Sequence, residues 1–279
     1  MERQSYGAMS AAATFAGRSV IRSFGRSRRS YFPVAAEPLD CTVGRGEEAN
    51  KEFPMAKDSG IELFSARVCP YAHRTRLVLA EKGLDFELTE IDFKDKPRRF
   101  LEISRYGKVP ALVHAGNEIY ESAIINEYLE EAFPEPALMP ADPGLRARVR
   151  IWIDFCDHHF LDDLYGAMRN QDAGKHRELK DKVEGHFRAL EDAVAGLGGT
   201  VGPYWLGERV SLLDFAFYPF FERLPAWAHY RGLGVPDDCP RLSQWAAAMA
   251  ERPSVREIAN SPEYYVERYQ SYAKAVLAA

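Results

Sequence analysis

The sequence contains few cysteines and no closely spaced pair of them. The four cysteines, Cys41, Cys69, Cys156 and Cys239, form neither a disulfide framework nor a zinc-ligand pattern, which indicates a reducing compartment. Ala72 stands where a second thiol would complete a Cys-x-x-Cys motif after Cys69. The motif therefore lacks a resolving thiol, and an oxidised Cys69 needs an external thiol to reduce it.

Long apolar stretches and an excess of positive charge are also missing. No apolar run approaches the roughly 20 residues that a membrane-spanning helix needs, so we expect no membrane span. The formal net charge of −5 and the isoelectric point near 5.9 argue against a nucleic-acid partner. With 279 residues, the chain is long enough for one large or two smaller folded domains.

Acidic residues are nearly absent from the first 36 positions, which contain six arginines and one acid, Glu2. Together with many serines and alanines, this composition is typical of an organelle transit peptide. The alternative is an extension produced by an upstream start codon or by vector sequence. We expect residues 1–57 to be an N-terminal extension and linker. The predicted location is mitochondrial or plastid if this segment is a transit peptide, and cytoplasmic otherwise.

The most informative pair of residues is Cys69-Pro70, between a predicted strand over 61–68 and a predicted helix over 69–83. Pro70 suits the first helical position, and Gly83 suits the position after the helix. Cys69 then faces free backbone N–H groups and the positive end of the helix dipole, which predicts a lowered thiol pKa. The alternative is a small apolar cysteine that fills the core. Basic residues in the first two turns add positive charge: His73, Arg74 and Arg76.

Strands and helices alternate up to residue 133. A strand over 85–92, with Phe86 and Leu88 expected to point inward, precedes a short helix over 97–105. A hairpin then covers 109–120, and a helix covers 122–132. The order βαβαββα predicts an α/β layer in which a parallel strand pair is followed by a hairpin.

Prolines between residues 133 and 143 mark a boundary, beyond which the hydrophobic period is helical. We therefore predict an α/β domain over 58–136 and an all-helical domain over 143–279. Ser211 and Asp214 form a variant of a helix capping box, and the aromatic residues after them are expected in the core. The expected helices cover 144–170, 175–197, 212–230, 240–251 and 262 to the C-terminus.

Three further features suit a small thiol ligand next to Cys69. Val109-Pro110 would offer backbone pairing groups if its peptide bond were cis, although most such bonds are trans. Glu121-Ser122 begins a helix and can hold an ammonium and a carboxylate, unless it merely caps that helix. Lys96 can hold a second carboxylate, unless it is a solvated surface lysine. Together these groups suit a tripeptide with a central thiol and two carboxylates, which is glutathione.

Residues 60–270 resemble the omega class of glutathione transferases. The Cys-Pro-aromatic-Ala motif separates that class from glutathione transferases that use Tyr or Ser. Two departures are Tyr71, where phenylalanine is commoner, and Lys108, where the residue is usually apolar. The resemblance rests on Cys69-Pro70-Tyr71-Ala72, the run from Arg74 to Leu79, Lys96-Pro97, Gly107, Val109-Pro110 and the run from Ile119 to Ile124.

The resemblance implies a thioredoxin-like N-terminal domain with a cis bond before Pro110. It implies that glutathione is the co-substrate and that Cys69 forms a mixed disulfide. The implied activity is thiol transfer or dehydroascorbate reduction with a small electrophilic or oxidised substrate, and we expect a homodimer without a metal. The alternatives are a glutathionyl-hydroquinone reductase, an etherase-type enzyme or a non-enzymatic glutathione-binding regulatory protein. The expected glutathione-binding residues are Tyr71, Lys96, Val109, Pro110, Glu121 and Ser122.

Overall fold

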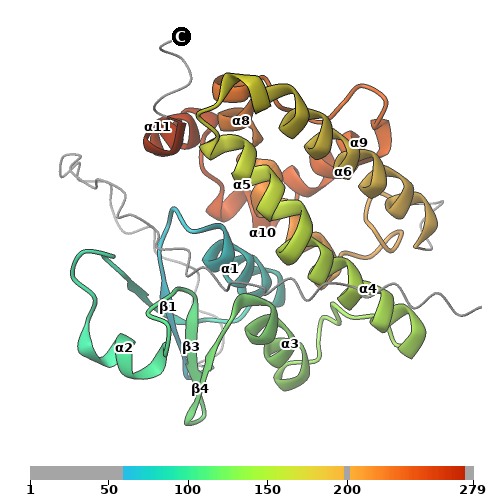
Figure 1. Ribbon diagram of the computed structural model, residues 1–279. Helices are drawn as coiled ribbons and strands as arrows, with labels where there is room; N and C mark the ends of the chain where they lie inside the picture. Colours follow the sequence, from blue (N-terminus) through green and yellow to red (C-terminus); the bar gives the residue numbers. More distant parts are fainter. Residues whose placement is uncertain (1–58, 198–201, 274–279) are drawn as a thin grey trace, which may run out of the picture. The chain divides into compact units, whose positions relative to one another are not determined.

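A mixed sheet flanked by helices is followed along the chain by a helical region (Figure 1). The computed structural model describes residues 59–197 and 202–273. The predictions about residues 1–57, including the transit peptide, lie outside these ranges. Among the described helices, none is long and apolar enough to cross a membrane.

The sheet has the strand order β2-β1-β3-β4. β1 runs parallel to β2 and antiparallel to β3, and β4 pairs antiparallel with β3, as predicted. α1 and α3 lie on one side of the sheet and α2 on the other, which is the expected thioredoxin-like arrangement (Figure 1). The elements are β1 (Ile61–Ser65), α1 (Pro70–Lys82), β2 (Glu87–Glu90), α2 (Arg98–Ile103), β3 (Ala111–His114), β4 (Asn117–Tyr120) and α3 (Ser122–Ala132).

Alternation along β1 divides its side chains between two apolar clusters, because successive residues of a strand point to opposite faces. Leu63 belongs to the cluster shared with α1, α3 and the helical region, whereas Phe64 belongs to a smaller cluster with Phe100 of α2. The prediction that Leu88 points inward is wrong. Leu88 pairs with Leu63 in register, but it lies on the edge strand β2 and is 44% exposed.

Local signals set both ends of α1 as predicted. Cys69 is the N-cap residue with Pro70 after it, and Gly83 ends the helix in the left-handed conformation with φ of 61°. Its N–H bonds to the carbonyls of Ala80 and Leu79, which is the glycine-terminated helix end expected from the sequence. β1 is shorter than predicted, because a turn after Ser65 leads into Cys69.

A buried ion pair joins α1 to the connection between the α/β and helical regions. Lys82 Nζ lies 2.8 Å from Glu130 Oε2 and also donates to the carbonyls of Phe133 and Pro136. The Glu130 carboxylate accepts the backbone N–H groups of residues 138 and 139. Because every charged atom of this pair has a partner, the proline-rich connection is held by specific hydrogen bonds rather than by packing alone.

The helical region differs from its prediction in three places. A π-helical turn, Cys156–Phe160, interrupts the helix expected over 144–170, and the helix expected over 212–230 divides in two before Pro225. One helix, over 253–258, was not predicted. The helices are α4 (Pro143–Phe155), α5 (Leu161–Arg169), α6 (His176–Gly196), α7 (Leu212–Glu222), α8 (Leu224–Arg231), α9 (Pro240–Ala250), α10 (Pro253–Ile258) and α11 (Pro262–Ala273), with a 3₁₀ turn at Ala173–Lys175.

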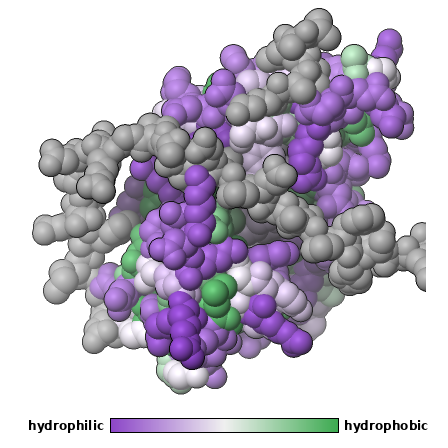
Figure 2. Space-filling view, turned by 60° about the vertical axis from the view of Figure 1, so that its left-hand side comes forward, coloured by the Kyte–Doolittle hydropathy of each residue, from purple (hydrophilic) through white to green (hydrophobic). Residues whose placement is uncertain are grey.

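α7 is the central helix of this region, and ten of its eleven residues are buried. The predicted capping box starts it: Asp214 Oδ2 accepts both the Ser211 N–H and the Ser211 hydroxyl at 2.7 Å. The predicted aromatic core residues are buried, and two of them, Phe215 and Phe217, have no exposed surface. α7 packs on α1, so the apolar core continues from the sheet into the helices. The face in Figure 2 is mainly hydrophilic, with small separate hydrophobic patches.

Candidate active site

Cys69 lies half-buried at the N-terminus of α1, where the sequence places it. Its Sγ donates to the carbonyl of Val109 across a distance of 3.7 Å. The backbone N–H groups of Tyr71 and Ala72 face the sulfur and favour its thiolate form. The structure therefore brings together the thiol and the Val109-Pro110 segment, which are 40 positions apart in the sequence.

The predicted lowering of the Cys69 pKa is wrong. Burial raises the pKa of the thiol above its ordinary value and outweighs the N–H groups of Tyr71 and Ala72. Two of the three expected basic neighbours contribute little: burial lowers the pKa of His73 well below its usual value, so its ring is neutral, and the Arg74 guanidinium bonds elsewhere. The helix N-terminus is present, but desolvation is the stronger effect.

The peptide bond between Val109 and Pro110 is cis, as the resemblance implies. The loop before it is held by Ser104, whose hydroxyl donates to the carbonyl of Lys108 at 2.7 Å and accepts the Lys108 N–H at 3.0 Å. Ser104 is buried. The loop that carries Val109 toward Cys69 therefore has a defined conformation, and the Lys108 side chain is exposed.

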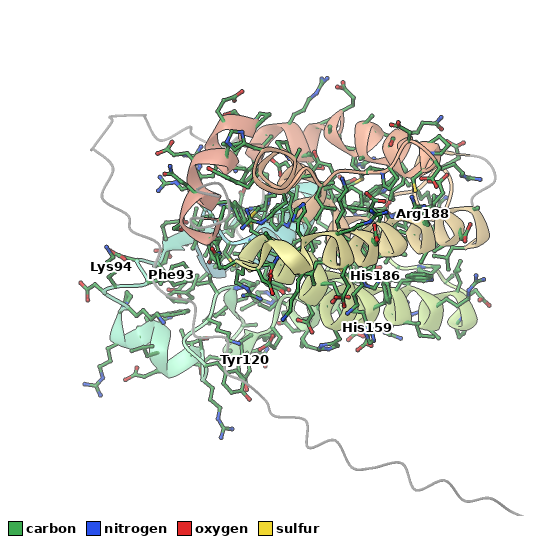
Figure 3. The ribbon with its side chains drawn as sticks, turned by 45° about the horizontal axis from the view of Figure 1, so that its top comes forward. Phe93, Lys94, Tyr120, His159, His186 and Arg188 are labelled. Carbon is green, nitrogen blue, oxygen red and sulfur yellow. The ribbon has the colours of Figure 1, made fainter. Side chains whose placement is uncertain are left out.

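Four segments that carry predicted binding residues border one apolar cluster. Cys69, Phe93, Val109 and Tyr120 all belong to this cluster or pack on it. Figure 3 shows Phe93 and Lys94 in the connection before α2, and Tyr120 at the end of β4. Lys96 Nζ lies 5.9 Å from the centroid of the Phe93 ring. The segments bearing Lys96 and Glu121 therefore reach the same end of the sheet as the thiol.

Glu121 has an unusual backbone conformation, with φ of 72°, in the region that non-glycine residues rarely adopt. Its side chain is exposed and does not cap α3. The alternative that Glu121 merely caps the helix is therefore not supported. Strained conformations of this kind cluster at active sites and ligand-binding segments.

Ser122 and Tyr71 are tied to the helical region. The buried Ser122 hydroxyl lies 3.4 Å from Arg74 Nη1, and Arg74 Nε donates to the carbonyl of Ala216 in α7 at 2.7 Å. The ring of Tyr71 packs edge-on against Phe220, with a centroid distance of 5.6 Å. The Tyr71 ring therefore contacts α7, while its backbone N–H faces the thiol.

Sequence reasoning missed two residues that shape the site, Ser104 and Arg223, and it missed the inward direction of Arg74. Both arginines are fully buried, although arginine is usually a surface residue. A lone serine directly after a short helix carries no signal, and Arg223 lies far from Cys69 in the sequence. These contacts can be identified only from the tertiary structure, because no sequence pattern indicates them.

The histidines of the helical region do not belong to this site. Figure 3 shows His159 and His186 in the helical region, away from Phe93. His186 Nε2 lies 2.6 Å from Asp163 Oδ2, and His158 pairs with Asp154 on the surface. Within residues 59–197 and 202–273, no group of three or more potential ligands can hold a metal ion.

Comparison with known proteins identifies the family. Residues 63–137 match the model of the glutathione S-transferase N-terminal domain, and residues 172–248 match that of the C-terminal domain. The chain belongs to the glutathione S-transferase family. It is 31% identical to glutathione S-transferase omega-1 of Rattus norvegicus over 239 residues, which cover 85% of this chain and 92% of the relative.

Solved structures of this family agree with the fold. Glutathione transferase Omega 3C from Trametes versicolor has a TM-score of 0.70 and 31% identity, and the match covers 80% of this chain and 94% of that chain. The Tau class enzyme of mango, Mangifera indica, has a TM-score of 0.72 and 28% identity, with coverage of 76% and 98%. The expected resemblance to omega-class glutathione transferases is confirmed.

Proposed function

We propose that this glutathione transferase is a glutathione-dependent thiol transferase or dehydroascorbate reductase that acts through a mixed disulfide at Cys69. The observation that carries the proposal is the thiol at the N-terminus of α1, 3.7 Å from the Val109 carbonyl. The segments with Lys96 and Glu121 border the same apolar cluster, and the sequence identity to omega-class enzymes supports this reading.

In the proposed thiol transfer, the Cys69 thiolate attacks the glutathionyl sulfur of a mixed disulfide. The old S–S bond breaks, and the substrate leaves as a thiolate that takes up a proton. A glutathione thiolate then attacks the Cys69–glutathione disulfide, which releases glutathione disulfide and restores the Cys69 thiolate. With dehydroascorbate, two glutathione thiols give up two electrons and two protons, and the products are glutathione disulfide and ascorbic acid.

Glutathione binding in this proposal uses the predicted residues in separate roles. Val109 pairs with the peptide through its backbone, and Lys96 pairs with one carboxylate. Glu121 and Ser122 hold the amino-acid head, where the N-terminus of α3 favours a negative charge. Tyr71 contributes its backbone near the sulfur, and Pro110 shapes the segment that faces Cys69.

The test is an activity panel with glutathione plus dehydroascorbate, a mixed disulfide, a glutathionyl-hydroquinone or a chlorinated aromatic compound. Cys69→Ser should abolish thiol transfer and dehydroascorbate reduction, because a hydroxyl cannot form a disulfide. Cys239→Ser is the matched control and should keep full activity, since Cys239 lies buried at the start of α9.

Mass spectrometry after brief exposure to glutathione disulfide gives a second readout. The first adduct should form on Cys69, and an adduct that forms first on another cysteine would remove the proposed mechanism. Turnover of glutathionyl-hydroquinone without activity on the first two substrates would favour the reductase alternative. Binding of glutathione without turnover of any substrate would favour the regulatory one. The proposed homodimer is checked by light scattering.

A further inference from the structure

Arg223 brings a fully buried guanidinium group to the turn that carries Cys69. The residue lies between α7 and α8 and is 0% exposed. Its Nη2 donates to the carbonyl of Val68, directly before Cys69, at 3.3 Å. Its Nη1 donates to the carbonyl of Pro219 at 2.6 Å. One side chain of the helical region therefore contacts the backbone of the turn that holds the thiol.

The groups that contact the Arg223 guanidinium are uncharged, so none of them neutralises its positive charge. Nη1 lies 3.2 Å from Nδ1 of the neutral His73, and the ring of Tyr265 covers the guanidinium at 4.5 Å. Within the described residues, Arg223 has no ion pair shorter than 4.0 Å, and its buried Nε has no hydrogen-bond partner. Glu222 lies beside this arrangement, with its Oε2 3.3 Å from the same His73 nitrogen.

Burying a positive charge with mainly neutral partners is costly, and a neutral donor could make the same bonds to two carbonyls. The charge itself therefore calls for an explanation. Burial raises the pKa of Cys69, while Arg223 and Arg76 oppose that effect by attracting the thiolate. Of these two arginines, Arg76 comes from α1 itself, and Arg223 is supplied by the helical region.

Arg76 and Arg223 are the positively charged neighbours of the thiol, because the tyrosines and the histidine near them are neutral. Burial raises the pKa values of the tyrosines, and lowers that of His73, so these groups are neutral near pH 7. Burial also raises the pKa of Glu222. Tyr71 of α1 and Tyr269 and Tyr272 of α11 interact with the thiol. His73 of α1 and Tyr265 of α11 contact the Arg223 guanidinium, and Glu222 at the end of α7 contacts His73.

We propose that Arg223 is a positioning residue of the Cys69 centre, which holds the Val68 carbonyl and supplies a buried positive charge from the helical region to the thiolate. The inference rests on the proposed function in one respect, because it takes Cys69 as the reactive thiol. It gives the packing of α7 against α1 a chemical role. The reactivity of Cys69 then depends on a residue more than 150 positions away in the sequence.

The test follows alkylation of Cys69 by iodoacetamide as a function of pH, with mass spectrometry of the peptide that contains Cys69. Arg223→Met keeps a long side chain and removes the charge. We expect the midpoint of the pH–rate profile to rise by about one unit, so that the rate at neutral pH falls about tenfold. Arg223→Lys keeps the charge, and its midpoint should stay within about half a unit of the wild type.

Arg231→Met is the matched control, because Arg231 is also buried and donates to the carbonyls of Ala167 and Met168 in α5. It can lower stability but should leave the Cys69 profile unchanged. Glu222→Gln removes the neighbouring negative charge and should move the midpoint down, opposite to Arg223→Met. If Arg223 had only a structural role, the two variants would not be expected to shift the midpoint of the pH–rate profile in opposite directions.

An unchanged profile in folded Arg223→Met, or an equal shift in Arg231→Met, would overturn the inference. If Arg223→Met does not fold, the other two variants test the inference. A pH–rate midpoint that does not fall in Glu222→Gln would overturn it. A midpoint that rises by about one unit in Arg223→Lys would also overturn it. Alkylation needs no glutathione, so these outcomes are separate from those of the activity panel.

Discussion

The Arg74 guanidinium lies 3.4 Å from the Ser122 hydroxyl and 2.7 Å from Asp157 Oδ1. Ser122 is a predicted glutathione-binding residue, whereas Asp157 belongs to the π-helical turn of the helical region. The same guanidinium contacts Cys156 Sγ at 3.2 Å, and burial raises the pKa of that thiol to about 12. One buried side chain of α1 therefore connects the start of α3 with the helices that cover it.

Arg74→Met should lower the free energy of unfolding by about 2–4 kcal/mol, because it leaves several acceptors and the Asp157 carboxylate without their charged partner. Urea denaturation measures this change. Arg150→Met is the control: Arg150 pairs with Glu127 on the surface, and its loss should cost less than about 1 kcal/mol. Equal costs for the two variants would show that the buried network contributes little to stability.

Glu121→Ala should weaken glutathione binding roughly ten- to a hundredfold, because a lost hydrogen bond to a charged group is worth about 1.5–3 kcal/mol. The melting temperature should not fall, since the exposed Glu121 side chain does not cap α3. Calorimetric titration and thermal unfolding measure the two effects. Glu118→Ala, on the exposed part of β4, should change neither. A lower melting temperature with unchanged affinity would instead favour a capping role for Glu121.

The alkylation rate of Cys69 in the wild-type protein should keep increasing above about pH 8.5, the ordinary pKa of a cysteine. Burial raises the pKa of Cys69, so at neutral pH its thiolate fraction is smaller than that of a free cysteine. Below the pKa the rate should rise about tenfold per pH unit. N-acetylcysteine serves as the reference thiol. A plateau reached below neutral pH would contradict this prediction and restore the lowered pKa that the sequence suggested.

Residues 1–60 fused to a fluorescent reporter should direct the reporter into mitochondria or plastids. The reason is the Arg-rich, acid-poor composition of the first 36 positions, which is typical of transit peptides. Imaging together with organelle markers measures the location. A matched fusion in which the six arginines are replaced by glutamine should remain in the cytosol. Diffuse cytosolic fluorescence of the unchanged fusion would favour the upstream-start alternative.

Elements with strong local signals could be predicted from the sequence. Pro70 and Gly83 mark the two ends of α1, and the predicted bounds of α3 agree with the structure. Ser211 and Asp214 form the expected capping box. Each of these features depends on residues within a few positions of one another, so the sequence contains the interactions that determine it.

Other features depend on residues that are distant in the sequence. Leu88 alternates like a buried residue, yet it is exposed because β2 lies at the edge of the sheet. The division between α7 and α8 has a local signal in Pro225, whereas the π-helical turn has none. Periodicity shows which side of an element is apolar, but it does not show what covers that side.

The sequence by itself determined the place of Cys69 at a helix N-terminus and the family to which the chain belongs. Only the tertiary structure decided the direction of the Cys69 pKa shift and the positions of Arg74 and Arg223. The helix N-terminus acts on the thiol through adjacent backbone groups, whereas desolvation depends on every segment packed around it. Because Arg223 and the tyrosines of α11, Tyr269 and Tyr272, interact with the thiol from distant parts of the chain, the protonation of Cys69 is a property of the folded chain and not of its local motif.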